Sequence, residues 1–436
     1  MDPTWSAFCA SLGMLALLLV GIPVSLSLSL AGFLGLAAIG GWELALTQLQ
    51  SLPYSVANDY AFAVVPTFVF MGNLVMHGGM ARELYLAADR WFGHLRGGLY
   101  LSTIAGSTAF GAVSGSTLVN ATVFTRIALP EMLRLGYSKK MASACIASVG
   151  TLDAMIPPSV AMVVYGIITE QSIGKLMIAG IIPGLLCALA YCVLVVVMVH
   201  LRPELAPLRA DKASWLERFR AIRGTWSIVL LFLIVMGGIY LGFFSPSASG
   251  AAGAFGALVI LLLRRRLTLR IVWNSLVDSA ATTSMLFIII IGGLLFSRML
   301  VMSGSITAVV DWISAQGMSQ LSLITVVCLM YIVLGCLTDA ISMLIVTLPF
   351  VFPVMVHAGV DPIWFGILCI QLLEIGAMHP PIGLNLYATV SASNGAVTME
   401  DIVQGIIPFV VLNLLFLVVL VAFPELALWL PSQMKS

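Results

Sequence analysis

Acidic and imidazole side chains occur inside two apolar stretches of this sequence, and each stretch is interrupted by a pair of prolines. Asp153 precedes Pro157-Pro158, and Glu374 and His379 precede Pro380-Pro381. An ionisable group inside an apolar segment of membrane length is costly and is functional by default. Such groups can bind a cation, a proton or a polar solute, so the two stretches are the first candidates for a site.

The proline pairs belong to a frame that occurs twice. The spacing of a proline, a glycine and a proline pair is identical in the two copies, which are Pro130, Gly136 and Pro157-Pro158, and Pro353, Gly359 and Pro380-Pro381. Such a frame is difficult to obtain by chance within apolar sequence. The repeat therefore predicts two homologous halves.

Each proline pair lies within a stretch long enough to cross a bilayer, residues 141–168 and residues 363–391. Proline removes a helical hydrogen bond and clashes with the preceding turn, so each crossing is expected to break in mid-membrane. The freed backbone groups must face a buried polar or water-filled cavity. Matching breaks in two halves point to the binding site of a transporter. A single proline pair could also be a kink without function.

The composition predicts a polytopic all-α membrane protein. Hydrophobic residues make up 61% of the chain and charged residues 9%, and the mean hydropathy is +1.09. No soluble core could bury that much apolar surface. The net charge of +1 gives no indication of nucleic-acid binding, and the seven cysteines contain no CxxC pair. We therefore expect neither a disulfide framework nor a bound metal cofactor.

The apolar runs predict crossings near residues 5–21, 24–41, 62–77 and 173–199, and near 226–244, 247–263, 283–302 and 401–423. Re-entrant hairpins are predicted at residues 97–129 and 320–352, because a hairpin keeps the flanking basic residues on one side of the membrane. Residues 43–60, 82–96 and 303–318 have the mixed polarity of interfacial or amphipathic helices.

Each half then has about five crossings, a re-entrant hairpin and a Pro-Pro-broken helix. Since five is odd, the two repeats must be inverted relative to each other. The first repeat covers residues 1–200, with scaffold spans in 1–97 and the hairpin and broken helix in 98–200. A linker at 201–224 leads to the second repeat, 225–436, which divides at 318 into scaffold spans and the second hairpin and broken helix. A cytoplasmic linker places all Lys and Arg on the cytoplasmic side except Lys175, Arg298 and Lys435.

Several motifs together resemble the large membrane subunit of TRAP (tripartite ATP-independent periplasmic) transporters. They are Phe62-Ala-Val-Val-Pro-Thr-Phe, Gly72-Asn73, His77-Gly-Gly, Gly93-His-Leu-Arg-Gly-Gly, Ser114-Gly-Ser-Thr, Gly150-Thr-Leu, Ile156-Pro-Pro-Ser and Pro380-Pro-Ile-Gly-Leu-Asn. The motifs keep their order over essentially the whole chain. None of them would be sufficient alone.

The resemblance implies an elevator-type secondary transporter in a bacterial inner membrane. Members of that family import organic acids such as dicarboxylates by sodium symport. They receive the substrate from a periplasmic binding protein and work with a small transmembrane subunit, which we expect to be a separate polypeptide here. Sodium is expected as the coupling ion, with no other cofactor and no enzymatic activity.

The candidate ion ligands gather at the hairpin tips and helix breaks. Hydroxyls, backbone carbonyls and one carboxylate suit a hard monovalent cation. In the simpler interpretation, the Ser, Thr and Gly residues only permit close helix packing. Asp339 argues for an ion site, because an ionisable residue at a re-entrant tip is functional by default. The candidate ion set is Ser114, Ser116, Thr117, Gly150, Thr151, Thr338, Asp339 and Gly376.

Three candidate substrate residues depart from the family pattern. Asp153 stands where Gly is usual, Glu374 where a small residue is usual, and His379 where Thr is common. In one interpretation Glu374 and His379, spaced near one helical turn, form a network that tunes a proton-sensitive or unusual substrate site. Alternatively, one or more of the three face an aqueous vestibule without a specific role. Asn120, Ser159 and Asn385 complete the candidate substrate set.

Two other functions fit parts of the sequence. A self-sufficient cation- or proton-coupled anion carrier of the same fold would need neither binding protein nor small subunit. An intramembrane hydrolase could use Asp153, Glu374 and His379, but the sequence has no HExxH and no Gly-x-Ser-x-Gly. Arg126 lies on the basic flank and Arg298 near a span end, where arginine snorkels, so neither is placed in the site.

Overall fold

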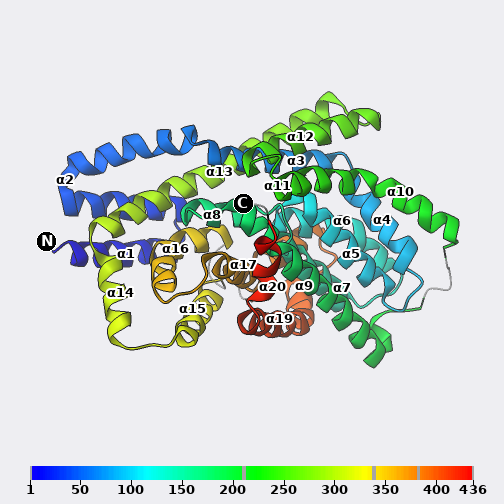
Figure 1. Cartoon of the computed structure of the whole chain (residues 1–436). Helices are drawn as coiled ribbons and strands as arrows, with labels where there is room; N and C mark the ends of the chain where they lie inside the picture. The colour runs from blue at the N-terminus through cyan, green and yellow to red at the C-terminus, as the bar shows by residue number, and fades with distance from the viewer. Residues whose placement is uncertain (1, 209–212, 336–339, 381–382, 435–436) are drawn as a thin grey trace.

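The computed structural model describes residues 2–208, 213–335, 340–380 and 383–434. Every regular element in these ranges is a helix, as predicted, and Figure 1 shows many of the longer helices lying side by side. Within the described residues seven helical segments are long and apolar enough to cross a membrane: Val24–Asn58, Tyr60–His77, Ile173–Leu201, Trp215–Tyr240, Pro246–Leu263, Leu269–Met302 and Met399–Ala422. The chain is therefore a multi-pass membrane protein.

The first half contains nine α-helices in the described residues. They are α1 (Pro3–Leu19), α2 (Val24–Asn58), α3 (Val64–His77), α4 (Met80–Phe92), α5 (Gly98–Ser114), α6 (Thr117–Arg134), α7 (Lys139–Gly150), α8 (Val160–Ile168) and α9 (Ile173–Leu201). Short 3-10 turns at Tyr60–Ala63 and Thr151–Ala154 precede α3 and follow α7.

The second half follows the same plan. Its helices are α10 (Trp215–Phe232), α11 (Gly238–Tyr240), α12 (Pro246–Leu263), α13 (Leu269–Met302), α14 (Ser305–Ala315), α15 (Gln320–Gly335), α16 (Ala340–His357), α17 (Pro362–Met378), α18 (Leu384–Ala392), α19 (Met399–Ala422) and α20 (Glu425–Ser432). A π-helical segment, Leu233–Gly237, joins α10 to α11, so these form one long span.

The two broken crossings occur where the proline pairs predict them. The helix α7 ends at Gly150, and α8 begins only at Val160, beyond Pro157-Pro158. In the second half α17 ends at Met378 and α18 begins at Leu384. Each proline pair thus separates two half-helices whose ends lie inside the protein.

The predicted hairpins also form, one before each of these breaks. The first hairpin pairs α5 with α6 and reverses at Gly115, whose φ of +64° is left-handed. The second hairpin is built from α15 and α16, on either side of residues 336–339. Each hairpin therefore precedes a broken crossing in the chain and packs against it.

Helix α13 is longer than the predicted span at 283–302. It begins at Leu269, because no Gly or Pro interrupts the sequence before Gly292. The corresponding part of the first half is divided: α2 bends at Gly41, where φ is 84°, and residues 42–58 form a separate helical arm that ends before Asp59. The predicted segment at 43–60 is thus helical, and α2 packs along α13 (Figure 1).

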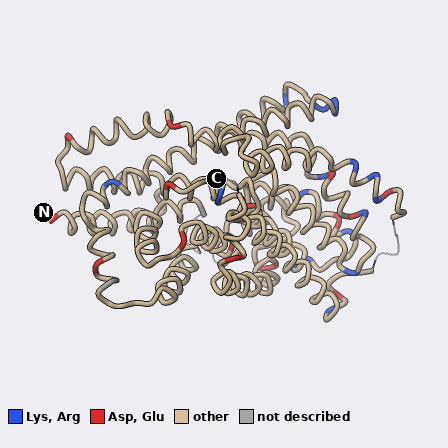
Figure 2. Tube along the Cα trace, viewed as in Figure 1, with Lys and Arg blue, Asp and Glu red and all other residues tan. Residues whose placement is uncertain are grey.

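Basic residues gather at the end of the molecule where α4, α10 and the last turn of α12 lie (Figure 2). The helix α4 is amphipathic, as predicted, with Leu84 and Tyr85 buried. Its Glu83 forms ion pairs with Arg264 at 2.5 Å and Arg266 at 2.6 Å, which join α4 to the end of α12. Within the predicted linker, α10 already begins at Trp215 after the Ser214 capping box.

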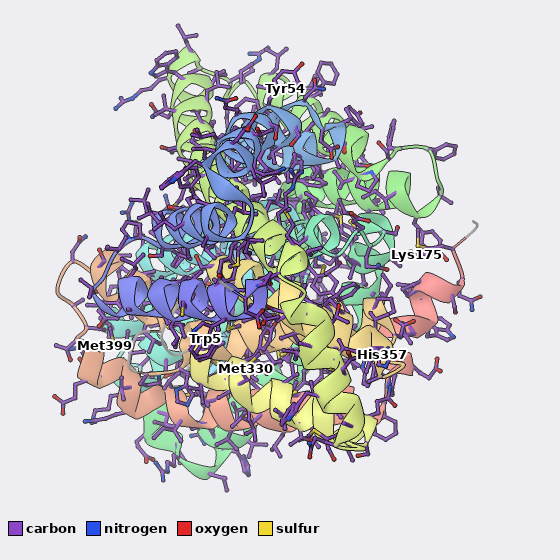
Figure 3. All side chains as sticks on the ribbon, turned by 90° about the vertical axis from the view of Figure 1, so that its left-hand side faces the viewer. Trp5, Tyr54, Lys175, Met330, His357 and Met399 are labelled. Carbon is purple, nitrogen blue, oxygen red and sulfur yellow. The ribbon has the colours of Figure 1, made fainter. Side chains whose placement is uncertain are left out.

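The outer surface is largely apolar. Viewed from the end that carries α1 and α14, side chains project outward from every visible helix, and they include Trp5 and Tyr54 (Figure 3). These two side chains are 58% and 73% exposed. Apolar exposure of this extent is rare on soluble proteins and is expected of helices that face lipid.

Candidate functional site

The tip of the first hairpin packs directly against the first helix break. A Cβ on Gly115 would lie 2.7 Å from the Pro158 carbonyl oxygen, so only glycine fits there. On another side of the tip, a Cβ on Gly72 of α3 would lie 2.7 Å from the Ser114 carbonyl oxygen. The tip is therefore held between the broken crossing and α3.

Asp153 is fully buried where these elements meet. It lies in the 3-10 turn after α7, and its carboxylate oxygens accept hydrogen bonds from Ser114 Oγ and Asn120 Nδ2. A Cβ on Gly111 would collide with the same carboxylate. A buried carboxylate requires hydrogen-bond donors, and the two arms of the hairpin supply them to Asp153 in the break. Three predicted site residues thus form one network.

Asn120 extends this network into the hairpin. Its Oδ1 accepts from Ser107 Oγ at 2.8 Å, and its Nδ2 also donates to the Ser107 carbonyl at 3.2 Å. These bonds fix which end of the Asn120 amide faces Asp153. Ser107 was not predicted, since a serine within a Gly-, Ser- and Thr-rich run carries no signal of its own.

Ser116 and Thr117 lie at the same tip. Ser116 is the N-cap of α6 and Thr117 its first residue, and both side chains are half-buried. Neither hydroxyl forms a hydrogen bond with the described part of the chain. They remain available as neutral oxygen ligands at the tip that also carries Ser114, a donor set that fits a monovalent cation.

Other predicted residues shape the first break. Gly150 allows α7 to approach α6, because a Cβ there would lie 2.9 Å from the Ala121 Cβ. The Thr151 hydroxyl donates to the Ser148 carbonyl at 2.8 Å. Ser159 caps α8 by accepting from the Met162 amide at 3.5 Å. All three lie at the break, with Thr151 and Ser159 bonded to its backbone.

The second break contains a carboxylate without a donor. Glu374 on α17 is 1% exposed, and neither of its oxygens has a hydrogen-bond partner among the described residues. The nearby Met155 amide already donates to the Leu152 carbonyl at 3.0 Å. The helix α17 packs against the 3-10 turn that carries Asp153. The two helix breaks therefore lie against each other.

The predicted network between Glu374 and His379 is wrong. His379 lies beyond the last turn of α17 in extended conformation, with φ −92° and ψ 127°, and its Nδ1 lies 2.6 Å from the Pro380 carbonyl oxygen. A five-residue separation places two side chains on different faces of a helix, since neighbours on one face are three or four residues apart. Neither Glu374 oxygen bonds His379, and α17 packs against α9 and the 3-10 turn that carries Asp153.

Gly376 and Asn385 lie on either side of the second break. A Cβ on Gly376 would lie 2.8 Å from the Gly335 Cα, so the second hairpin contacts α17 backbone to backbone. Asn385 on α18 donates to the Ala147 carbonyl of α7 at 3.4 Å, and its buried Oδ1 has no partner in the described residues. The two broken crossings thus contact each other. Thr338 and Asp339 lie outside the described residues.

A second polar network was not predicted. Asn413 on α19 donates to Tyr191 Oη at 2.6 Å and accepts from Gln371 Nε2 at 2.8 Å. All three side chains are fully buried, and Gln371 lies one turn before Glu374. The sequence signal for this network was the presence of Gln371 and Asn413 within otherwise apolar spans, because amide side chains need hydrogen-bond partners in a membrane.

Comparison with known proteins identifies the family. The model of the family described as "Tripartite ATP-independent periplasmic transporter, DctM component" matches residues 12–426. The chain belongs to this family. It is 32% identical over 380 residues to the C4-dicarboxylate TRAP transporter large permease protein DctM of Pseudomonas aeruginosa, a match that covers 87% of the chain and 88% of that protein. A transporter permease rather than an enzyme is therefore indicated.

Two further relatives show the range of the family and of the fold. The ectoine TRAP transporter large permease protein TeaC of Halomonas elongata is 30% identical over 423 residues, which cover 96% of the chain and 97% of TeaC. The crystal structure of the Alcanivorax borkumensis YdaH transporter has a TM-score of 0.58 at 13% identity and covers 98% of both chains. The YdaH match supports the fold alone.

Proposed function

We propose that the chain is the large membrane subunit of a sodium-coupled importer of a small organic acid in a bacterial inner membrane. A periplasmic binding protein delivers the acid, and a separate small transmembrane subunit completes the transporter. The name of one relative supports a carboxylate substrate, since DctM is named for C4-dicarboxylates. Another relative, TeaC, is named for ectoine, so the names cover more than one organic solute. The substrate within this class is open.

One observation carries the sodium-coupled mechanism. The first hairpin tip and the first helix break meet at Asp153, which accepts from Ser114 and Asn120, and Ser116 and Thr117 follow Ser114 at the same tip. A monovalent cation held by these oxygens would offset the buried negative charge and bind the tip to the break. Loss of the ion would weaken that contact, so ion binding is coupled to closure of the hairpin.

The fold also suggests which parts move. Helices α5–α9 and α15–α19 contain the hairpins and broken crossings, whereas α1–α3 and α10–α13 form the surrounding scaffold. In an elevator mechanism the first group slides as a body against the second. The contact between Gly72 and Ser114 lies on the boundary between them, where a close backbone approach permits sliding without interlocked side chains.

A second candidate is proton coupling by the same fold, with or without partner subunits. Glu374 favours it, because a buried carboxylate without a hydrogen-bond partner among the described residues is stabilised by a proton. A proton at Glu374 and a cation at Asp153 are compatible, since the two residues belong to different breaks.

Reconstitution tests the proposal. The chain is placed in proteoliposomes with or without its small subunit, and uptake of labelled organic acids is measured with and without a sodium gradient and with and without the cognate binding protein. We expect uptake only when sodium and the binding protein are both present. Uptake by the chain alone would establish the self-sufficient carrier, and sodium-independent uptake driven by a pH gradient would establish proton coupling.

A further inference from the structure

Arg218 near the start of α10 is a cation without an anionic partner among the described residues. Its guanidinium carbon lies 5.0 Å from the ring centroid of Trp215 and 5.8 Å from that of Trp91. It forms no ion pair with a carboxylate of the described residues, and its buried Nε has no hydrogen-bond partner there. Among the described residues, its side chain has a polar contact with His94 Nδ1 at 3.4 Å.

The other arginine with an aromatic contact in this part of the described chain is neutralised. Arg264 stacks near Trp226 at 5.9 Å, donates to the Gly224 carbonyl at 2.7 Å and pairs with Glu83 at 2.5 Å. The contrast matters because Arg218 belongs to α10 and Arg264 contacts the same helix from the end of α12. A half-buried guanidinium with no counter-charge is expected to hold an anion from outside the chain.

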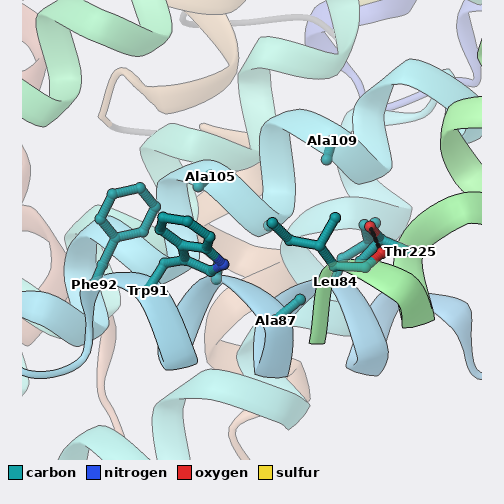
Figure 4. A pocket seen from close by; sticks show the side chains of 10 residues that line it. Leu84, Ala87, Trp91, Phe92, Ala105, Ala109 and Thr225 are labelled. Carbon is teal, nitrogen blue, oxygen red and sulfur yellow. Dashed lines mark hydrogen bonds between the residues drawn. The ribbon is translucent and has the colours of Figure 1, made fainter. Parts of the chain in front are cut away.

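An apolar groove begins beside this cation. It has a volume of about 330 Å³ and runs between α4, α5 and α10. Figure 4 shows Trp91 and Phe92 at one end, Leu84 and Thr225 at the other, and Ala105 and Ala109 above Ala87 between them. The small alanine side chains create the groove, and its lining is almost entirely apolar.

The helical register connects the cation to the groove. Ile222 and Thr225 line the groove, and Arg218 lies one turn before Ile222 on the same face of α10. Trp91 is shared, because it lines the groove and also lies against the guanidinium; its indole N–H donates to the Arg218 carbonyl at 3.3 Å. One continuous surface thus carries a positive charge at one end and apolar side chains along its length.

We propose that this surface binds one anionic phospholipid, with the phosphate on Arg218 and an acyl chain in the groove. The lipid occupant is favoured by its matching pattern of a charged head and an apolar tail. It is also favoured by the place of the groove, at the end of the molecule where Lys and Arg gather (Figure 2). Cytoplasmic loops carry such an excess, and tryptophans are enriched at the headgroup level. Trp91, Trp215 and Trp226 lie beside the arginines here.

Lipid titration of the purified chain in detergent tests the site. Binding of phosphatidylglycerol and of phosphatidylcholine with the same acyl chains is measured by native mass spectrometry and by the unfolding temperature. We expect phosphatidylglycerol to bind about fivefold more tightly than phosphatidylcholine, because the attraction of one arginine to an anionic headgroup has about this effect on affinity. Arg218→Gln is expected to remove this preference, whereas Arg223→Gln, on an exposed residue of the same helix, keeps it.

The groove is tested separately by Ala109→Phe, which fills it and is expected to weaken both lipids. Each variant is judged by its own ratio between the two lipids, so a general loss of stability does not imitate the result. Equal binding of the two lipids to the unaltered chain, or a full preference in Arg218→Gln, would overturn the proposal. So would competition by glycerol phosphate alone, which would indicate a phosphate site, or loss of the preference when the small subunit is added, which would indicate a protein occupant.

Discussion

Asp153 in the first helix break accepts a hydrogen bond from Asn120 in the second arm of the first hairpin. This bond closes the hairpin on the break, because Ser114 at the end of the first arm donates to the same carboxylate. The spacing to the proline pairs matches Asp153 with Gly376, and Thr151 with Glu374. The two halves thus carry their carboxyl groups at different distances from the proline pair, Asp153 four residues before Pro157 and Glu374 six residues before Pro380.

Gly111→Ala is expected to destabilise the protein. The new Cβ would collide with the Asp153 carboxylate, and overpacking of this kind costs about 1–3 kcal/mol. The unfolding temperature in detergent measures the effect. Gly13→Ala in α1 is the matched control, since a Cβ there meets nothing within 4 Å and helix propensity favours alanine. Equal unfolding temperatures for the two variants would contradict the packing of Gly111 on Asp153.

Glu374→Gln is expected to leave the unfolding temperature at pH 8 unchanged or higher. The substitution keeps the shape and removes an acid that no donor among the described residues serves. Glu425→Gln, on an exposed residue of α20, is the control and is expected to have no effect. A fall of several degrees in the Glu374 variant alone would show that its carboxyl group forms a stabilising bond in the folded protein. In uptake, persistence of a pH-gradient effect in this variant would remove Glu374 from proton coupling.

Asn413→Leu is expected to cost about 1–3 kcal/mol. It leaves the Gln371 amide and the Tyr191 hydroxyl without their shared partner in a dry core. Adding Gln371→Leu removes one orphaned group, so the double variant is expected to be more stable than the sum of the single changes predicts. A strictly additive double-mutant cycle would show that the two amides do not act together.

Much of the fold was predictable because it depends on local rules. Proline pairs break helices wherever they occur in a long apolar run, and Gly115 allows the chain to reverse, so both broken crossings and the first hairpin were predicted at their positions. The full length of α13 and the existence of α20 were missed. Their residues are less apolar than a span, and helix formation there depends on packing, as in the bond of Asn73 to Ser279 at 2.9 Å.

The site was predictable in part for the same reason. Ser114, Asn120 and Asp153 were chosen individually, since polar groups in apolar stretches stand out, but their direct contact depends on how the hairpin folds back. The pairing of Glu374 with His379 failed because the helix ends before His379. Contacts between distant segments, such as Gln371 with Asn413, leave no mark in the local sequence.

The sodium dependence of uptake in the Asp153→Asn variant tests the central claim most directly. In proteoliposomes containing both membrane subunits, supplied with the binding protein, the sodium concentration for half-maximal uptake is measured for this variant, for the unaltered chain and for Asp311→Asn. Asp311 is exposed on α14 and serves as the control. Loss of the charged ligand is expected to raise that concentration about tenfold, which corresponds to about 1.4 kcal/mol, with no change in the control. An unchanged sodium requirement in Asp153→Asn would show that the junction of hairpin tip and helix break does not bind the coupling ion.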